Sequence, residues 1–122
     1  TIEERETGTA KEIVTKQILS ALKPVSNFTN TNLMIAYEPV WAIGSGKAAT
    51  AKDAQNMCIH IRNTISEISE EKLSQNIPIL YGGSVNSDNI KQFISQPDIN
   101  GALIGSASLD PNEFIKLIHK IK

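Results

Sequence analysis

The sequence predicts an α/β protein in which three parallel strands alternate with helices, and two observations carry this prediction. Three short apolar runs, at residues 33–37, 77–81 and 101–105, have the length of buried strands and show no polar alternation. Amphipathic stretches typical of helices stand before, between and after these runs. Strands that are apolar on both faces are typical of a parallel sheet covered by helices.

Size and composition fit one small domain. The chain has 122 residues, of which 40% are hydrophobic and 20% are charged, and its formal net charge is −1. We therefore expect residues 1–122 to form a single domain. There is no basic stripe to indicate nucleic-acid binding, and no apolar run approaches the roughly 20 residues of a membrane-spanning helix. The single cysteine, Cys58, excludes an internal disulfide and favours a reducing, cytoplasmic setting.

The first helix is expected at residues 9–22, after an acidic segment with the composition of a solvated surface. Apolar residues recur in it at helical spacing and include Ile13, Ile18 and Leu22. Pro24 disfavours helical geometry at the residue before it, so the helix should end near Leu22.

The second helix is expected from Thr50 to about Ile68. Thr50 is a good N-cap residue, and Asp53 three positions later completes a variant of the capping box. The apolar face of this helix includes Ile68 and Cys58, and we interpret Cys58 as a small core residue rather than a reactive thiol. His60 lies off that face and is expected at the surface.

Two more helices are expected after the second and third apolar runs. The first should span about residues 88–95, capped by Asn86 or Ser87. The second should begin at Asp110–Pro111, since proline is favoured in the first turn after an aspartate cap. Its apolar residues are expected to form a buried side: Phe114, Ile115, Leu117, Ile118 and Ile121.

The end of the first apolar run indicates a catalytic group. Glu38 follows the run directly, and Pro39 cannot extend a central strand because it has no N–H group to donate. An apolar loop at residues 40–43 comes next, and Gly44 and Gly46 then provide flexible joints. A carboxylate at the tip of a buried strand, followed by such a loop, predicts a general base beneath a closing lid that excludes water.

All three apolar runs are followed by loops of small residues: Gly44-Ser45-Gly46, Gly82-Gly83-Ser84 and Gly105-Ser106. Glycine lets backbone N–H groups approach an anion closely, and serine adds a hydroxyl donor. Helices that begin just after Ser84 and near Ser106 would add the positive ends of their dipoles. One such loop is best explained as a tight turn, whereas three at the same edge of a sheet predict a phosphate site.

Two of these segments carry a resemblance to a known family. Residues 36–47, AYEPVWAIGSGK, resemble the signature of the triosephosphate isomerase family, and Ser45 is their only departure from its usual form. Residues 81–85, YGGSV, resemble the next signature, and the similarity extends over nearly the whole chain. The resemblance implies the C-terminal part of a (β/α)8 TIM barrel, a fold of about 250 residues. Residues 1–122 would then be one partial TIM-barrel domain that begins just after the fifth barrel strand.

The resemblance also implies a reaction and its residues. The family interconverts dihydroxyacetone phosphate and glyceraldehyde 3-phosphate by proton transfer through an enediolate, and it is itself a well-known example of a glutamate base working beneath a closing lid. Position for position, Glu38 is the base, and Gly44, Ser84, Gly105 and Ser106 bind the substrate phosphate. Ser106 stands where the family usually has a second glycine, so its backbone contact depends on the local dihedral angles.

No metal or organic cofactor is implied, and the full-length protein is expected to be a cytoplasmic homodimer that serves glycolysis and gluconeogenesis. The lysine and histidine that complete the family's chemistry belong to its N-terminal half. Neither His60 nor His119 is assigned to that role. Because three strands cannot close an eight-stranded barrel, we expect little or no isomerase activity from the 122-residue chain alone.

Two other interpretations stay open. A different phosphate-binding half-barrel, from the sugar-phosphate isomerases or lyases, would share the glycine–serine loops but not the AYEPVW segment; the upstream sequence, with or without the expected lysine and histidine, would decide. A non-enzymatic phosphate-sensing module would bind sulfate or phosphoglycolate with Glu38 dispensable. Replacing Glu38 by glutamine in the full-length protein would separate this module from the enzyme.

Overall fold

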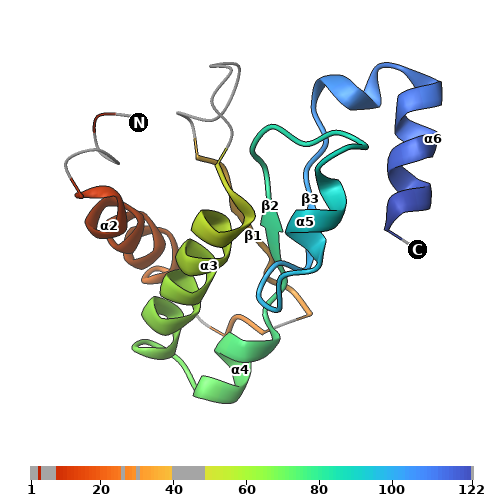
Figure 1. Ribbon diagram of the computed structural model, residues 1–122. Helices are drawn as coiled ribbons and strands as arrows, with labels where there is room; N and C mark the ends of the chain where they lie inside the picture. The colour runs from red at the N-terminus through yellow and green to blue at the C-terminus, as the bar shows by residue number, and fades with distance from the viewer. Residues whose placement is uncertain (1–2, 4–7, 26, 30, 40–48, 122) are drawn as a thin grey trace.

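The computed structural model describes residues 3, 8–25, 27–29, 31–39 and 49–121. Within them, one parallel sheet has the strand order β1-β2-β3, with β1 at Ile35–Tyr37, β2 at Ile79–Tyr81 and β3 at Gly101–Ala102. Helices connect successive strands (Figure 1). The predicted α/β class, with three parallel strands alternating with helices, is confirmed, and it is consistent with part of a TIM barrel.

The described residues also form the helices around this sheet. They are α2 at Ala10–Leu22, α3 at Ala51–Ser66, α4 at Glu71–Asn76, α5 at Ile90–Ile94, the 3-10 helix η2 at Ser106–Ser108 and α6 at Pro111–Lys120. Helices α2 and α3 pack side by side, and α6 stands at the opposite end of the molecule (Figure 1). None of these helices has the length and apolarity needed to cross a membrane.

Local sequence signals set the starts of α3 and α6. The Thr50 hydroxyl accepts a hydrogen bond from the Asp53 N–H at 3.0 Å. The Asp110 carboxylate accepts one from the Asn112 N–H at 2.9 Å, with Pro111 in the first turn. Both caps satisfy amide groups that a helix start leaves without an intrahelical partner, and both predicted starts are confirmed.

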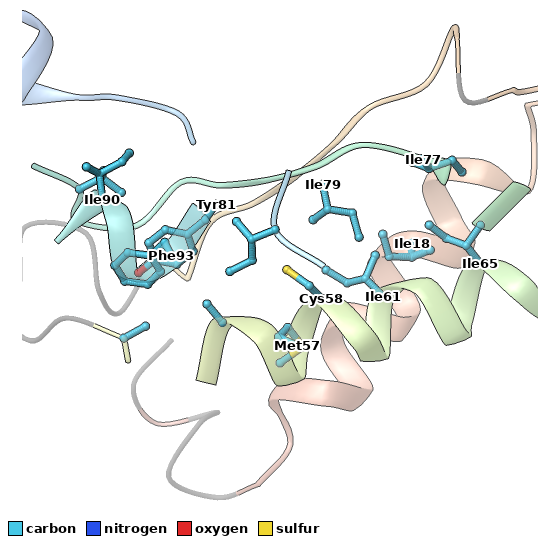
Figure 2. Packing of buried hydrophobic residues seen from close by; sticks show 14 of the residues in the cluster. Ile18, Met57, Cys58, Ile61, Ile65, Ile77, Ile79, Tyr81, Ile90 and Phe93 are labelled. Atoms are coloured by element: carbon cyan, nitrogen blue, oxygen red, sulfur yellow. The ribbon is translucent and has the colours of Figure 1, made fainter. Parts of the chain in front are cut away.

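The hydrophobic core lies between the sheet and the helices (Figure 2). Ile79 and Tyr81 of β2 are fully buried, and the Tyr81 ring stacks on Phe93 of α5 with ring centroids 4.1 Å apart. Cys58 of α3 is also fully buried, and burial raises the pKa of its thiol to about 12. The prediction that Cys58 is a core residue rather than a reactive thiol is therefore confirmed.

The other face of the sheet is open over the described residues. Side chains alternate between the two faces of a strand, and those of Met34 and Ala36 point away from the helices. Met34 is 58% exposed, and Ala36 is exposed as well. The apolar runs were predicted to be buried on both faces, and the described helices bury them on one.

The third strand is shorter than predicted. Only Gly101 and Ala102 pair with β2, opposite Leu80 and Tyr81. The Leu103 N–H still donates to the Tyr81 carbonyl oxygen at 2.9 Å, and residues 104–105 then lead into η2. An apolar run therefore sets the upper limit of a strand, and the point at which pairing stops depends on the neighbouring strand.

The apolar side of α6 is largely exposed, contrary to prediction. Leu117 is buried, while the other four predicted residues are between 36% and 53% exposed: Phe114, Ile115, Ile118 and Ile121. Helix α6 contacts α5 and η2, and a cavity of about 470 Å³ lies between α6, α5 and β3. Apolar spacing shows which side of a helix is suited to burial, but it does not show that a partner covers that side.

Two predictions for α3 need correction. His60, expected at the surface, is partly buried, and its Nε2 lies 2.8 Å from Thr15 Oγ1 and 3.1 Å from the Lys11 carbonyl oxygen. It therefore links α3 to α2. Ile68, expected on the buried face, is 42% exposed because α3 ends at Ser66.

A buried charged network fastens the amino-terminal end of the sheet. Arg62 of α3 is 3% exposed, and its Nε donates to Asp98 Oδ1 at 2.8 Å. The same guanidinium donates to the carbonyl oxygens of Ser74 and Ile77 and to the side-chain oxygen of Asn100. The segments that lead into β2 and β3 are thereby tied to one side chain of α3.

Candidate functional site

A cavity lies at the carboxyl edge of the sheet, where the three strands end. Its volume is about 260 Å³, and it is lined by residues that follow each strand: Glu38, Gly82, Gly83, Ser84, Val85, Leu103, Ile104, Gly105 and Ser106. Parallel strands have their carboxyl ends at the same edge, which is why segments far apart in the sequence meet here.

Glu38 extends from the end of β1 across the backbone of Gly82. A β-carbon at Gly82 would lie 2.6 Å from Glu38 Cγ and 3.3 Å from its Cδ, so a side chain there would displace the glutamate. The Gly82 N–H donates to the Tyr37 carbonyl oxygen at 2.8 Å, which fixes the two strand ends relative to each other. Glu38 is exposed, and its carboxylate accepts no hydrogen bond from the described residues. It is therefore available as a proton acceptor at the rim of the cavity.

The phenol of Tyr81 occupies the space behind Gly83. A β-carbon at Gly83 would overlap the Tyr81 hydroxyl and ring, so this loop position requires glycine. The buried hydroxyl has no hydrogen-bond partner among the described residues. Burial, with a smaller contribution from the negative charge of Asp53, raises the pKa of Tyr81 to about 12, so the phenol stays neutral.

Ser84 sits in a loop that is held by side-chain-to-backbone hydrogen bonds. Its carbonyl oxygen accepts a bond from Asn89 Nδ2 at 2.9 Å. The Asn86 N–H donates to Asn89 Oδ1 at 2.9 Å, and the Asn89 N–H donates back to Asn86 Oδ1 at 3.1 Å. Helix α5 begins at Ile90, two residues after the expected start. The cap predicted at Asn86 is present, because Asn86 Oδ1 also accepts from the Asp88 N–H at 2.9 Å and the Asn86 carbonyl oxygen accepts from the Ile90 N–H at 3.0 Å.

Gly105 and Ser106 border the cavity beside the end of β3. The Gly105 carbonyl oxygen accepts hydrogen bonds from the N–H of Ser108 at 3.0 Å and from its hydroxyl at 2.6 Å. No heavy atom lies within 4 Å of the place that a Gly105 β-carbon would take, so this backbone is open to a ligand. Helix η2 starts at Ser106 as expected, but its three residues supply a tight turn and not a long helix dipole.

Four of the five site residues predicted from the sequence line this one cavity: Glu38, Ser84, Gly105 and Ser106. Gly44 and the expected lid lie outside the described residues. Neither His60 nor His119 is among the lining residues. The lining residues Leu103 and Ile104 were not predicted to belong to the site, because their apolar run was assigned to a strand; their place directly before Gly105 was the available signal.

The groups around the cavity are suited to a ligand that carries an anionic group close to a carbon that can lose a proton. Serine hydroxyls and open glycine backbone offer hydrogen-bond donors, and a single carboxylate stands at the rim. Among the residues that the structure describes, no three His, Cys, Asp or Glu side chains gather where they could hold a metal ion. The cavity thus combines hydrogen-bond donors for an anion with a carboxylate, a group that can serve as a general base.

Comparison with known protein families agrees with this geometry. The model of the family described as triosephosphate isomerase matches residues 1–121. The match includes all three strand ends and the loops that line the cavity. The chain therefore belongs to the triosephosphate isomerase family.

Proposed function

We propose that this chain supplies the catalytic base and the phosphate-binding edge of a triosephosphate isomerase, which interconverts dihydroxyacetone phosphate and glyceraldehyde 3-phosphate. The observation that carries the proposal is the common cavity of about 260 Å³ lined by Glu38, Ser84, Gly105 and Ser106. Family membership supports a triose phosphate as the substrate.

The serine and glycine loops bind the phosphate end of the substrate. The Ser84 hydroxyl accepts no described hydrogen bond and donates none, so it is free to donate to a phosphate oxygen. The N–H groups of Gly105 and Ser106 are the other donors, and the absence of a side chain at Gly105 lets the anion approach. Gly44 of the lid contributes a further N–H in this proposal. Binding of the phosphate holds the reacting carbons beside Glu38.

Glu38 transfers the proton. Its carboxylate removes a proton from C1 of dihydroxyacetone phosphate, and the electron pair of the broken C–H bond forms the enediolate double bond. A proton passes from the C1 hydroxyl to the C2 oxygen, the carboxylic acid returns a proton to C2, and the carbonyl group is then at C1, which gives the aldehyde isomer. Gly82 leaves open the space that the Glu38 side chain occupies. The developing oxyanion needs donors from a lysine and a histidine, which the family resemblance assigns to the other half of the barrel.

Closure of the lid over the cavity would keep water from the enediolate and limit loss of its phosphate. Family membership supports a homodimeric enzyme of glycolysis and gluconeogenesis as the setting of this activity, with the cytoplasm as its compartment.

The test is the Glu38→Gln variant in a complete barrel that contains this chain. General base catalysis contributes about 10²–10⁴-fold in rate, so kcat should fall by at least that factor while 2-phosphoglycolate still binds. Glu67→Gln, at an exposed glutamate outside the cavity, is the matched control and should retain full turnover.

Turnover of Glu38→Gln within tenfold of the unchanged barrel would contradict the proposed role of the base. If phosphoglycolate binds equally well to both proteins and neither isomerises triose phosphates, the chain belongs to a phosphate-sensing module instead. The 122-residue chain alone should give background turnover.

A further inference from the structure

The carboxylate of Glu113 on α6 reaches the loop that follows β2. Its Oε1 accepts a hydrogen bond from the Ser87 N–H at 2.9 Å. Ser87 is buried, so without Glu113 its N–H group would be left with little access to water as a hydrogen-bond partner. Glu113 is not among the lining residues of the cavity, so it contacts the loop at a point outside the cavity.

The segment around Ser87 holds further hydrogen bonds that reach Ser84 at the cavity. Asn86 and Asn89 flank Ser87 and bond to each other's backbone amides at 2.9 and 3.1 Å. Asn89 Nδ2 then donates to the Ser84 carbonyl oxygen at 2.9 Å. Helix α5 begins at Ile90, and the Ile90 N–H donates to the Asn86 carbonyl oxygen at 3.0 Å, which also anchors this segment. The position of Ser84 thus depends on these polar contacts, and the Glu113 carboxylate adds one at Ser87, inside the same segment.

The rest of α6 is held by few apolar contacts. Leu117 is its one buried apolar side chain among the described residues, and the apolar residues on either side of it are exposed. A helix with so little burial does not fix the loop by packing alone. The hydrogen bond to Ser87 is therefore a large share of what joins α6 to the loop.

We propose that Glu113 is a positioning residue, which orders residues 84–89 through Ser87 and so presents the Ser84 hydroxyl to the anion. The inference rests on the proposed function, because the anion is the substrate phosphate. Glu113 touches neither the cavity nor the reacting atoms. Its contribution appears in anion affinity and loop order, and not in the proton-transfer step itself.

The experiment compares three variants of the 122-residue chain: Glu113→Ala, Glu113→Gln and the control Asn112→Ala. Glutamine keeps an oxygen that can accept the Ser87 N–H, while alanine does not. Asn112 is the exposed neighbour whose side chain makes no described hydrogen bond. Amide hydrogen exchange at residues 84–89 reports loop order, and a titration with inorganic sulfate, followed by the amide shifts of Ser84 and Gly105, reports anion affinity.

Hydrogen bonds to charged groups are stronger than those between neutral groups, so Glu113→Ala should speed exchange of the Ser87 amide by about tenfold. We expect the Kd for sulfate to rise by roughly three- to tenfold, because only part of this order reaches Ser84. Glu113→Gln keeps a weaker, neutral hydrogen bond and should fall between the alanine variant and the unchanged chain, whereas Asn112→Ala should stay within about twofold of the unchanged chain in both measurements.

Exchange and affinity of Glu113→Ala within twofold of the unchanged chain would overturn the inference, as would a glutamine variant as impaired as the alanine variant. If Glu113→Ala does not fold, Glu113→Asp, which keeps the charge but shortens the side chain, replaces it with the same expectation. An unchanged chain that binds no sulfate would overturn the proposed function, and exchange at Ser87 would still decide the role of Glu113.

Discussion

The two ends of the sheet are built in opposite ways. At the amino-terminal end, the buried Arg62 guanidinium is paired with Asp98 and donates to backbone carbonyl oxygens, so charged and polar groups are satisfied internally. At the carboxyl end, Glu38 and Ser84 are exposed, and they border a cavity among small residues. One end fastens the strands, and the other leaves donors and an acceptor available for a ligand.

This difference predicts which substitutions should change the stability of the fold and which should change ligand binding. Polar groups that are paired within the protein stabilise the fold, whereas polar groups without a protein partner can bind a substrate. Substitutions at the amino-terminal end should therefore change unfolding first. Substitutions around the cavity should change anion binding first.

The largest effect is expected from Arg62→Ala. Removal of one partner of a buried ion pair costs about 3–5 kcal/mol, because the remaining charge stays buried without compensation. Here the carbonyl oxygens of Ser74 and Ile77 would lose the Arg62 donor, and the Asp98 carboxylate would be left with the hydrogen bond from Gln55 Nε2. Urea denaturation followed by circular dichroism should show this loss as a lower midpoint.

The matched control for Arg62→Ala is Lys52→Ala, which removes an exposed positive charge from the same helix. Surface substitutions of this kind usually change stability by less than about 0.5 kcal/mol. Equal midpoints for the two variants would show that the Arg62 network does not fasten the sheet.

A smaller effect on stability, but a larger one on binding, is expected from Gly83→Ala. The added β-carbon would meet the Tyr81 hydroxyl, which is buried and cannot move without displacing Phe93. Overpacking of this kind costs about 1–3 kcal/mol, and here the loop is the part most free to move. The Kd for sulfate should rise, and the amide shifts of Ser84 should change even without sulfate.

The double variant Gly83→Ala/Tyr81→Phe tests whether the contact with the Tyr81 hydroxyl causes the loss of affinity. Because phenylalanine lacks the hydroxyl that meets the new β-carbon, it should restore part of the lost affinity. No recovery in the double variant would mean that the Tyr81 ring carbons, which phenylalanine keeps and which also approach the added β-carbon, are enough to displace the loop.

Features that depend on a few neighbouring residues were predicted from the sequence. The cap at Thr50 and the start of α6 at Asp110 follow from side chains within three residues of the helix start, and both are confirmed. The family was also predicted, from the signature around Glu38, and the family match confirms it. The roles of the individual site residues stay predictions.

Features that depend on distant partners were not predicted. Arg62 stands between Ile61 and Ile65 on the apolar face of α3, and nothing near it in the sequence shows that Asp98 pairs with it. The exposed side of α6 was predicted to be buried for the same reason, since helical spacing carries no information about a partner. The contact between Glu113 and Ser87 likewise joins residues 26 positions apart.

The smallest effect is expected when the pH is lowered and the Glu113 carboxylate becomes protonated. Hydrogen bonds from the side chain and backbone of Ser87, assisted by the positive charge of Lys116, hold the pKa of Glu113 below its ordinary value of 4.5. Because the folded-state pKa is lowered, the stabilisation is present above the unfolded pKa and is lost as the pH falls through the folded pKa. Between about pH 5 and pH 3, the unchanged chain should lose more Tm than Glu113→Gln does.

Glu71→Gln, at an exposed glutamate of α4 whose carboxylate accepts no described hydrogen bond, is the control for this measurement and should follow the unchanged chain. Parallel Tm profiles for Glu113→Gln and Glu71→Gln would show that the Ser87 contact does not persist in solution.

The most direct test of the account is a titration of the 122-residue chain with 2-phosphoglycolate, followed by backbone amide shifts. The account predicts that the amides of Ser84, Gly105 and Ser106 shift together along one binding curve, while those beside the Arg62 network stay in place. Shifts centred on the amino-terminal end, or separate curves for the three amides, would contradict a single phosphate site at the carboxyl edge.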